Sequence, residues 1–246
     1  MLVDATVLVT GASSGIGQAC AHSFAARGAN LVLCARRGER LEQLAGELDA
    51  EVTVLELDVR DREAVTEQLA PFDQVDVLVN NAGLAAGKGP LQEGDFDHWD
   101  RMIDTNVTGL LNVTRTVVPG MVARGSGHVV NIGSIAGRDT YPGGAVYCAS
   151  KAAVDRITRG LRMDLLGTGV KVSTVDPGLV ETEFSVVRFE GDTDKVNKVY
   201  EGIDPLTAED IAETVTWVAD RPPNVQVTEV VVLAAEQATA TMVHRG

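Results

Sequence analysis

Cysteine is scarce in this chain of 246 residues, which contains three. Cys20, Cys34 and Cys148 lie far apart in the sequence, and no pair of them has the short spacing typical of metal ligands. An odd number of irregularly spaced cysteines is also not what a disulfide framework requires. We therefore predict no metal site, and we interpret the three cysteines as small buried residues.

Long apolar runs are missing as well. No stretch approaches the roughly 18 uninterrupted apolar residues of a membrane helix. The first residues lead directly into a predicted strand, without the basic segment and cleavage site of a leader peptide. We expect a cytoplasmic protein without a membrane partner.

Positive charge is in short supply: 21 Lys and Arg stand against 35 Asp and Glu, which gives a formal net charge of −14. Nucleic acid phosphates need clustered Lys and Arg, so we expect no nucleic acid partner. Arginine outnumbers lysine. Together with the acidic surface, this bias could reflect a saline cytoplasm, but a GC-rich genome would give the same arginine bias. An anionic ligand must bind where positive charge is locally concentrated, which draws attention to arginines near the motifs below.

Short runs rich in β-branched residues alternate with helical patterns along the whole chain. Strands are predicted at residues 5–10, 30–35, 52–57, 75–80, 127–133, 170–176 and 226–233, and helices at 15–28, 38–48, 61–70, 97–124, 144–167 and 207–220. With right-handed crossovers, this alternation gives a doubly wound sheet. We predict an α/β fold: a single Rossmann-type domain, residues 1–246, whose mostly parallel seven-stranded sheet is flanked by helices.

Two segments interrupt the alternation. Residues 84–96 are rich in Gly and Ala, and residues 179–204 follow the sixth predicted strand. Ligands of such folds bind at the carboxyl ends of the strands. We therefore expect residues 179–204 to form a mobile substrate lid.

A glycine-rich turn follows the first predicted strand at residues 10–17 and leads into a helix. Gly11, Gly15 and Gly17 permit a tight turn and a close approach of the backbone to a pyrophosphate, whose charge the N-terminus of the helix favours. The spacing GxxxGxG differs from the GxGxxG fingerprint, and such a segment can be a mere turn. Its place between a strand and a helix favours a dinucleotide site.

Tyr147 and Lys151 are four residues apart in a predicted helix and therefore share one of its faces. A free tyrosine has a pKa of about 10, and a neighbouring ammonium can stabilise its phenolate. Ser134 ends a predicted buried strand, where its hydroxyl can polarise a carbonyl. The spacing YxxxK alone is equally compatible with a solvated surface pair.

Taken together, these motifs resemble the short-chain dehydrogenase/reductase family along nearly the whole chain. Residues 10–17 resemble its cofactor loop, residues 80–83 its motif after the fourth strand, and residues 177–178 its turn after the sixth. Asn106, Ser134, Tyr147 and Lys151 match its catalytic tetrad. Residues 102–106, 177–185 and 187–192 further resemble the NADP-dependent 3-hydroxy acid dehydrogenases, a group described as serine or allo-threonine dehydrogenases and malonic semialdehyde reductases.

The resemblance implies a set of residues that hold the cofactor NADP(H). They are Gly11, Ser13, Ser14, Gly15, Ile16, Gly17, Arg36, Arg37, Asp58, Val59, Asn80, Ala82, Gly83, Tyr147, Lys151, Pro177, Gly178, Val180 and Thr182. The choice of NADP over NAD also has a basis in the residues themselves. The second strand ends at Arg36 and Arg37 without the acid that binds the ribose of NAD, and guanidinium groups suit a 2′-phosphate. A solvated arginine pair is the alternative.

The resemblance also implies a role for each member of the tetrad. Tyr147 exchanges a proton with the substrate oxygen, Ser134 holds that oxygen, Lys151 lowers the pKa of Tyr147, and Asn106 helps to hold a water. A 3-hydroxy acid must also leave its anionic end near a cation. Arg188, within the expected lid, is the first candidate for this contact, and Arg138 is the second. The alternative is that Arg188 pairs with Glu181, Glu183 or Glu190 and orders the lid.

The sequence thus predicts an NADP-dependent oxidoreductase that interconverts a small 3-hydroxy acid, such as serine, allo-threonine or 3-hydroxypropionate, and its carbonyl form. Two alternatives remain: a reductase of another small aldehyde or ketone, such as sulfoacetaldehyde, and a non-catalytic NADPH-binding sensor. The family usually forms tetramers, so we expect a homotetramer. His244 and Arg245 end the chain, where tails usually fray, and their reach into an active site is left open.

Overall fold

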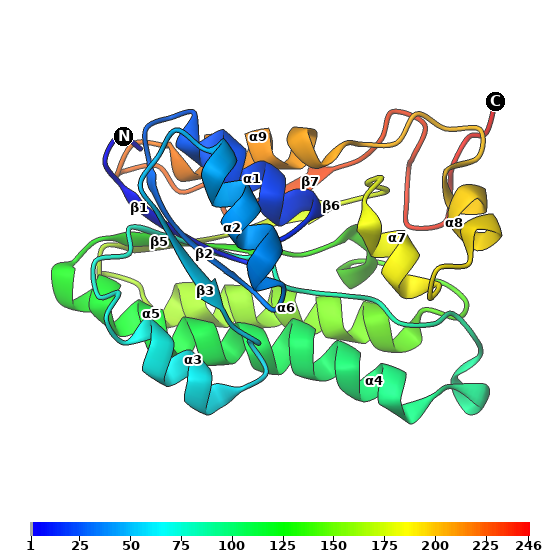
Figure 1. The fold of residues 1–246 in the computed structure, drawn as a ribbon. Helices are drawn as coiled ribbons and strands as arrows, with labels where there is room; N and C mark the ends of the chain where they lie inside the picture. The colour runs from blue at the N-terminus through cyan, green and yellow to red at the C-terminus, as the bar shows by residue number, and fades with distance from the viewer. Residues whose placement is uncertain (1) are drawn as a thin grey trace.

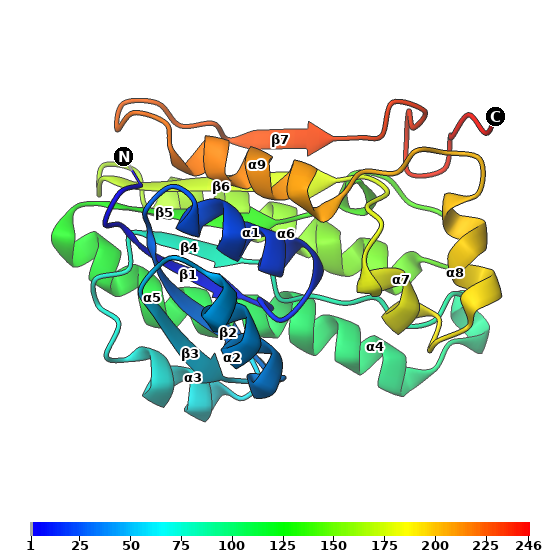
Figure 2. The same cartoon turned by 45° about the horizontal axis from the view of Figure 1, so that its top comes forward.

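The computed structural model describes residues 2–246, which form one sheet of parallel strands between two layers of helices (Figure 1). The strands are β1 (Thr6–Thr10), β2 (Asn30–Ala35), β3 (Val52–Glu56), β4 (Val77–Asn80), β5 (Gly127–Ile132), β6 (Val170–Pro177) and β7 (Glu229–Val232). Their order, β3-β2-β1-β4-β5-β6-β7, reverses direction between β1 and β4, as in doubly wound sheets. Figure 2 shows β7 at one edge of the sheet and β3 at the other. The predicted fold class is confirmed.

Helices cover both faces of the sheet. On one face lie α1 (Gly15–Ala25), α2 (Gly38–Glu47) and α9 (Ala208–Ala219), and on the other lie α3 (Arg62–Leu69), α4 (Phe96–Ile103), α5 (Leu110–Arg124) and α6 (Ala145–Asp164) (Figure 1). Within β1, Val7 and Val9 belong to the core under α1, whereas Leu8 belongs to the core under α5. Side chains alternate along a strand, so a continuous apolar run fills both cores.

The helix predicted at residues 97–124 is interrupted. Between α4 and α5 lies a π-helical turn, η2 (Asp104–Gly109). Asn106 within it bonds to the backbone of Leu84 from both ends of its amide: Leu84 N donates to Asn106 Oδ1 at 2.8 Å, and Nδ2 donates to Leu84 O at 2.8 Å. Turns of this kind are frequent at functional sites, and periodicity alone does not show them.

Two short helices occupy the segment predicted as a lid, α7 (Glu183–Arg188) and α8 (Thr193–Tyr200). Figures 1 and 2 place both beyond the carboxyl ends of the strands. The C-terminal tail lies against this segment, because the Arg245 guanidinium donates to the carbonyls of Val199 and Glu201, and Gly246 N donates to Gly202 O at 3.1 Å. The tail therefore does not fray. None of the helices in residues 2–246 is both long and apolar enough to cross a membrane.

Candidate active site

A cavity of about 990 Å³ extends along the carboxyl edge of the sheet, from the ends of β2 and β3 to β5, β6 and α7. Its size is within the range of small-molecule sites. The predicted site residues that line it are Gly11, Ser13, Ser14, Gly15, Ile16, Arg36, Arg37, Asp58, Val59, Ala82, Gly83, Ser134, Tyr147, Lys151, Pro177, Gly178, Val180, Thr182 and Arg188. The structure brings these residues to one place from seven separate segments. Gly17, Asn80 and Asn106 lie behind the cavity wall.

The glycine turn has the geometry of a phosphate cradle. Gly11 and Gly15 have φ angles of +66° and +55°, in the left-handed region that favours glycine. At Gly17, a Cβ would lie within 2.5 Å of Asn81 Nδ2, so glycine is required for α1 to pack this closely against the end of β4. The side chain of Ser14, the N-cap of α1, does not cap the helix, which leaves the N–H groups of its first turn for a ligand.

Asn80 was predicted to contact the cofactor, but it does not line the cavity, whereas its neighbour Asn81 does. Asn80 ends β4 and points into the protein, where its Nδ2 donates to Thr114 Oγ1 at 3.0 Å and to Asn131 Oδ1 at 2.9 Å. Asn81 lines the cavity instead, and its Nδ2 donates to Thr10 O at 2.9 Å. Asn80 therefore fixes β4 to β5, and Asn81 fixes the wall of the cavity to β1.

One end of the cavity is rich in arginine. Arg37 donates from Nη2 to Ser14 Oγ at 2.7 Å and from Nε to Ser13 Oγ at 3.2 Å. The carboxylate of Glu183, at the start of α7, lies 3.0 Å from Arg37 Nη1 and 2.8 Å from Arg40 Nη1. Two guanidinium groups thus already hold a carboxylate here, and two hydroxyls accept from one of them, an arrangement that fits the 2′-phosphate of NADP.

Asp58 lies on the same side of the cavity as Arg36. Its carboxylate is 2.6 Å from Arg60 Nη2, and hydrogen bonding to Arg60 lowers its pKa. Asp58 is therefore ionised and held in place at the end of the cavity where an adenosine would lie.

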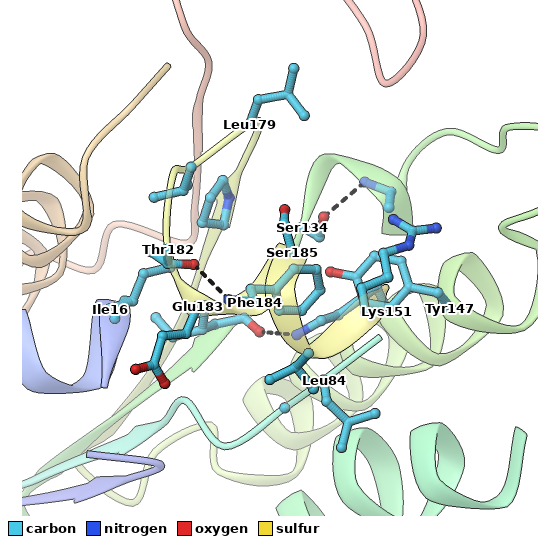
Figure 3. A pocket seen from close by; sticks show the side chains of 18 of the residues that line it. Ile16, Leu84, Ser134, Tyr147, Lys151, Leu179, Thr182, Glu183, Phe184 and Ser185 are labelled. Carbon is cyan, nitrogen blue, oxygen red and sulfur yellow. Dashed lines mark hydrogen bonds between the residues drawn. The ribbon is translucent and has the colours of Figure 1, made fainter. Parts of the chain in front are cut away.

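The other end of the cavity holds the predicted proton-transfer residues. Ser134 follows β5, whereas Tyr147 and Lys151 lie one turn apart on α6. Both are buried, with exposed fractions of 8% for Tyr147 and 7% for Lys151. Lys151 Nζ donates to Ile132 O at 2.8 Å, and the three side chains lie together opposite Phe184 (Figure 3).

Burial raises the pKa of the Tyr147 phenol, and the hydrogen bond with Ser134 and the charge of Arg188 oppose that rise in part. The sequence assigned this lowering effect to Lys151. In this structure the ammonium is bonded to a backbone carbonyl, and its own pKa falls to about 8 because of burial, against the charge of Asp176. The acid form of Tyr147 is therefore the stable one at neutral pH.

Asn106 reaches the site through its neighbours. In addition to its bonds with Leu84, its Nδ2 donates to Ser150 Oγ at 3.0 Å. Its Oδ1 lies 3.2 Å from where a Cβ on Gly83 would be, and Lys151 Nζ lies 3.6 Å from the same point. Asn106 therefore lies beside Lys151, behind the wall that Gly83 forms.

Arg188, the last residue of α7, points its guanidinium at the tyrosines. Its Cζ lies 5.4 Å from the ring centroid of Tyr141 and 5.7 Å from that of Tyr147. Within residues 2–246 Arg188 forms no ion pair, and its buried Nη2 has no hydrogen-bond partner. Pairing with Glu181, Glu183 or Glu190 was the alternative. Glu183 is instead bonded to Arg37 and Arg40, Glu190 is bonded to His98 Nε2 at 2.9 Å, and the exposed Glu181 forms no ion pair with Arg188.

Arg138 is not placed to meet a substrate. Its Nε lies 2.6 Å from Asp176 Oδ2, and its Nη2 lies 2.8 Å from Glu229 Oε2. Arg138 does not line the cavity. It connects the end of β6 to the first residue of β7, so this second candidate for the substrate anion is withdrawn.

Several lining residues escaped the sequence analysis. Lys88, Glu183 and Phe184 lie in the two segments that break the alternation of strands and helices, 84–96 and 179–204, and that break was the signal that could have found them. Tyr141 lies in the loop before α6, where no such signal was present. Arg245 also lines the cavity, which brings the C-terminal tail into this molecule's own site.

Comparison with known proteins decides the family. Residues 5–192 match the model of short chain dehydrogenases. The chain belongs to the short-chain dehydrogenase/reductase family. It is 47% identical over 245 residues to the NADP-dependent 3-hydroxy acid dehydrogenase YdfG of Salmonella typhi, covering 97% of this chain and 99% of that one. The predicted family is confirmed.

Two further members of the family are similar over nearly their full length. A sulfoacetaldehyde reductase of Chromohalobacter salexigens is 48% identical over 239 residues, which are 94% of each chain. The closed form of a serine dehydrogenase complexed with NADP⁺ superimposes with a TM-score of 0.93 at 44% identity, covering 98% of this chain and 100% of that one.

Proposed function

We propose that this short-chain dehydrogenase/reductase interconverts a small 3-hydroxy acid, such as serine, allo-threonine or 3-hydroxypropionate, and its carbonyl form, with NADP(H) as cofactor. NADP(H) supplies or accepts the hydride when bound. The names of the relatives and the arginine-rich end of the cavity support this cofactor. The glycine turn holds the pyrophosphate at the N-terminus of α1, and Arg36, Arg37 and the hydroxyls of Ser13 and Ser14 meet the 2′-phosphate.

The residues that exchange a proton with the substrate lie at the opposite end of the cavity. Tyr147 gives its phenolic proton to the substrate oxygen in reduction and takes it back in oxidation. Ser134 fixes that oxygen beside the phenol. The charged Lys151 is held near Tyr147 by its bond to Ile132 O. Asn106 fixes the positions of Ser150 and of the backbone of Leu84.

The single observation that carries the proposal is the Arg188 guanidinium beside Tyr147: its Nε donates to Gly87 O, but its buried Nη2 has no hydrogen-bond partner and it forms no ion pair within residues 2–246. A charged N–H group that is shielded from water is costly without an acceptor. The planar fork of arginine matches a carboxylate bidentately. A hydroxy acid of three carbons places its hydroxyl at Tyr147 and its carboxylate at Arg188.

A screen in both directions tests the proposal. The purified protein is assayed with NADP⁺ and hydroxy acids, and with NADPH and the matching aldehydes. We expect turnover of 3-hydroxypropionate and malonic semialdehyde at kcat/KM values at least tenfold above those of uncharged compounds of equal size, such as 1-propanol and propanal. Equal or better turnover of the uncharged compounds contradicts the proposal.

Sulfoacetaldehyde is the second candidate, because a sulfonate fits the same guanidinium and a relative that is 48% identical carries that name. The screen includes it as a further substrate. A non-catalytic sensor is disfavoured by the intact set of Ser134, Tyr147 and Lys151 within one cavity. NADPH oxidation with any of these aldehydes separates an enzyme from a sensor.

We further propose that the enzyme is a cytoplasmic homotetramer and that residues 179–204 close over bound ligands. Leu111, with an exposed fraction of 44%, and the half-buried Ile157 and Leu161 offer apolar contacts on α5 and α6, whereas Val117 and Val118 belong to the chain's own core. A monomeric mass by light scattering at micromolar concentration contradicts the tetramer.

A further inference from the structure

The end of α7 that carries Arg188 is bonded to the segment of residues 84–96. Gly87 N donates to Arg188 O at 3.0 Å, and Arg188 Nε donates to Gly87 O at 3.4 Å. The backbone of Gly87 therefore contacts both the main chain and the guanidinium of Arg188. A shift of Gly87 changes where this guanidinium lies relative to the ring of Tyr147, whose centroid is 5.7 Å from Arg188 Cζ.

The ring of His98 lies against Gly87. Gly87 has a φ of +64°, in the left-handed region that favours glycine, and a Cβ at this position would lie 2.8 Å from His98 Nδ1. His98 belongs to the first turn of α4, which is capped because Asp95 Oδ1 accepts from Asp97 N at 2.8 Å and from His98 N at 3.4 Å. The capped helix thus holds the ring beside the residue to which Arg188 is bonded.

The other ring nitrogen of His98 bonds to the lid. His98 Nε2 lies 2.9 Å from Oε1 of Glu190, which follows Arg188 by two residues. Because a carboxylate only accepts, Nε2 is the donor, and it can donate in the neutral or the charged form of the ring. Glu190 has a φ of +53°, a costly conformation for a residue other than glycine, which persists where surrounding contacts hold it. The bond to His98 is such a contact.

His98 therefore contacts the chain next to Arg188 on two sides, at Gly87 and at Glu190. It lines a separate hollow of about 260 Å³ and does not line the main cavity, so it acts through its neighbours. We propose that His98 is a positioning residue, which with Glu190 fixes the end of α7 so that the Arg188 guanidinium faces Tyr147. This inference rests on the proposed function, in which Arg188 receives the anion of the substrate.

The test compares His98→Ala with the wild type in NADPH-dependent reduction of malonic semialdehyde and of propanal. We expect KM for the semialdehyde to rise at least fivefold, with kcat changed by less than twofold and kcat/KM for propanal nearly unchanged. His98→Gln keeps an N–H donor for Glu190 and should raise KM less than His98→Ala does.

Glu190→Ala, at a side chain that is 66% exposed, provides a second variant that removes the same bond without touching α4. It should raise KM for the semialdehyde in the same way, and the double variant should raise it no further than the larger single effect, because both changes remove one contact. The matched control is His22→Ala on the opposite face of the sheet, where Nε2 lies 3.7 Å from Glu47 Oε2. It should change neither KM.

An unchanged KM for the semialdehyde in both His98→Ala and Glu190→Ala, or equal losses on the semialdehyde and propanal, overturns the inference. If His98→Ala does not fold, as judged by its thermal unfolding, Glu190→Ala alone decides. These outcomes leave the hydroxy acid function intact, provided that the wild type prefers the semialdehyde. A wild type without that preference refutes the hydroxy acid function and the inference with it.

Discussion

The arginines at the two ends of the cavity differ in whether they are paired with a carboxylate. At the adenosine end, Arg37 and Arg40 share the carboxylate of Glu183, and Arg60 is paired with Asp58. At the catalytic end, Arg188 lies against the rings of Tyr141 and Tyr147 without an ion pair in residues 2–246. The first set can exchange one anion for another when the cofactor binds. Under the proposed function, the anion of the substrate completes the second.

The helix α7 connects these two ends. Glu183 is its first residue and Arg188 its last, so about 7.5 Å of helix separates the two residues along the axis. A movement of α7 therefore changes both anion sites together.

The largest effect is expected for Tyr147→Phe. The ring still packs against Phe184, but the transferable proton is lost, so turnover should fall by roughly 10²–10⁴-fold. NADPH affinity, measured by fluorescence titration, should remain nearly unchanged. More than a few per cent of residual kcat would show that another group supplies the proton.

The pH dependence of the two directions should differ. Burial raises the pKa of Tyr147, so the phenol keeps its proton at neutral pH. Oxidation needs the deprotonated form, whose population rises roughly tenfold per pH unit below the pKa, whereas reduction needs the protonated form. Between pH 6 and about 8, where Lys151 still holds its charge, oxidation should rise steeply and reduction should stay level. Parallel profiles in the two directions would contradict this assignment.

Cofactor preference should be the next largest effect. Replacing Arg36 and Arg37 together with neutral residues removes charged contacts to the 2′-phosphate, at a cost of about 1.5–3 kcal/mol each. The ratio of kcat/KM for NADPH to kcat/KM for NADH should fall by at least tenfold. The value of kcat/KM for NADH itself should change little. A wild-type ratio close to one would mean that this end does not recognise the phosphate.

The smallest effect is expected for Glu183→Gln. Its carboxylate competes with the 2′-phosphate for Arg37, and an exposed ion pair contributes about 0.2–1 kcal/mol. NADPH should therefore bind roughly two- to fivefold more tightly, while NADH affinity stays the same. Glu181→Gln, an exposed neighbour, serves as the control. Weaker NADPH binding would show that Glu183 orients the arginines toward the phosphate and does not compete with it.

The sequence predicted those parts of the site that depend on local pattern. The glycine turn lies between a strand and a helix, and Tyr147 and Lys151 are separated by one helical turn, so their relative positions follow from the secondary structure. Alternating strands and helices likewise specify a parallel sheet and the edge at which ligands bind.

The parts of the site that the sequence did not predict depend on contacts between segments that are distant in the sequence. Whether Arg138 is free depends on Asp176 and Glu229, which the order of β5, β6 and β7 brings beside it. That Asn81 lines the cavity and Asn80 does not follows from the pleat at the last residue of β4, a boundary that propensity does not fix to one residue.

The central claim, that Arg188 receives the substrate anion, is tested most directly by Arg188→Ala assayed with a charged and an uncharged substrate of similar size. The variant is compared with the wild type in NADPH-dependent reduction of malonic semialdehyde and of propanal, with Arg188→Lys as the charge-conserving control. The account predicts that KM for the semialdehyde rises at least tenfold in Arg188→Ala and by less in Arg188→Lys, while kcat/KM for propanal is nearly unchanged. Equal losses on both aldehydes would contradict it, because Arg188 would then hold the lid and not the substrate.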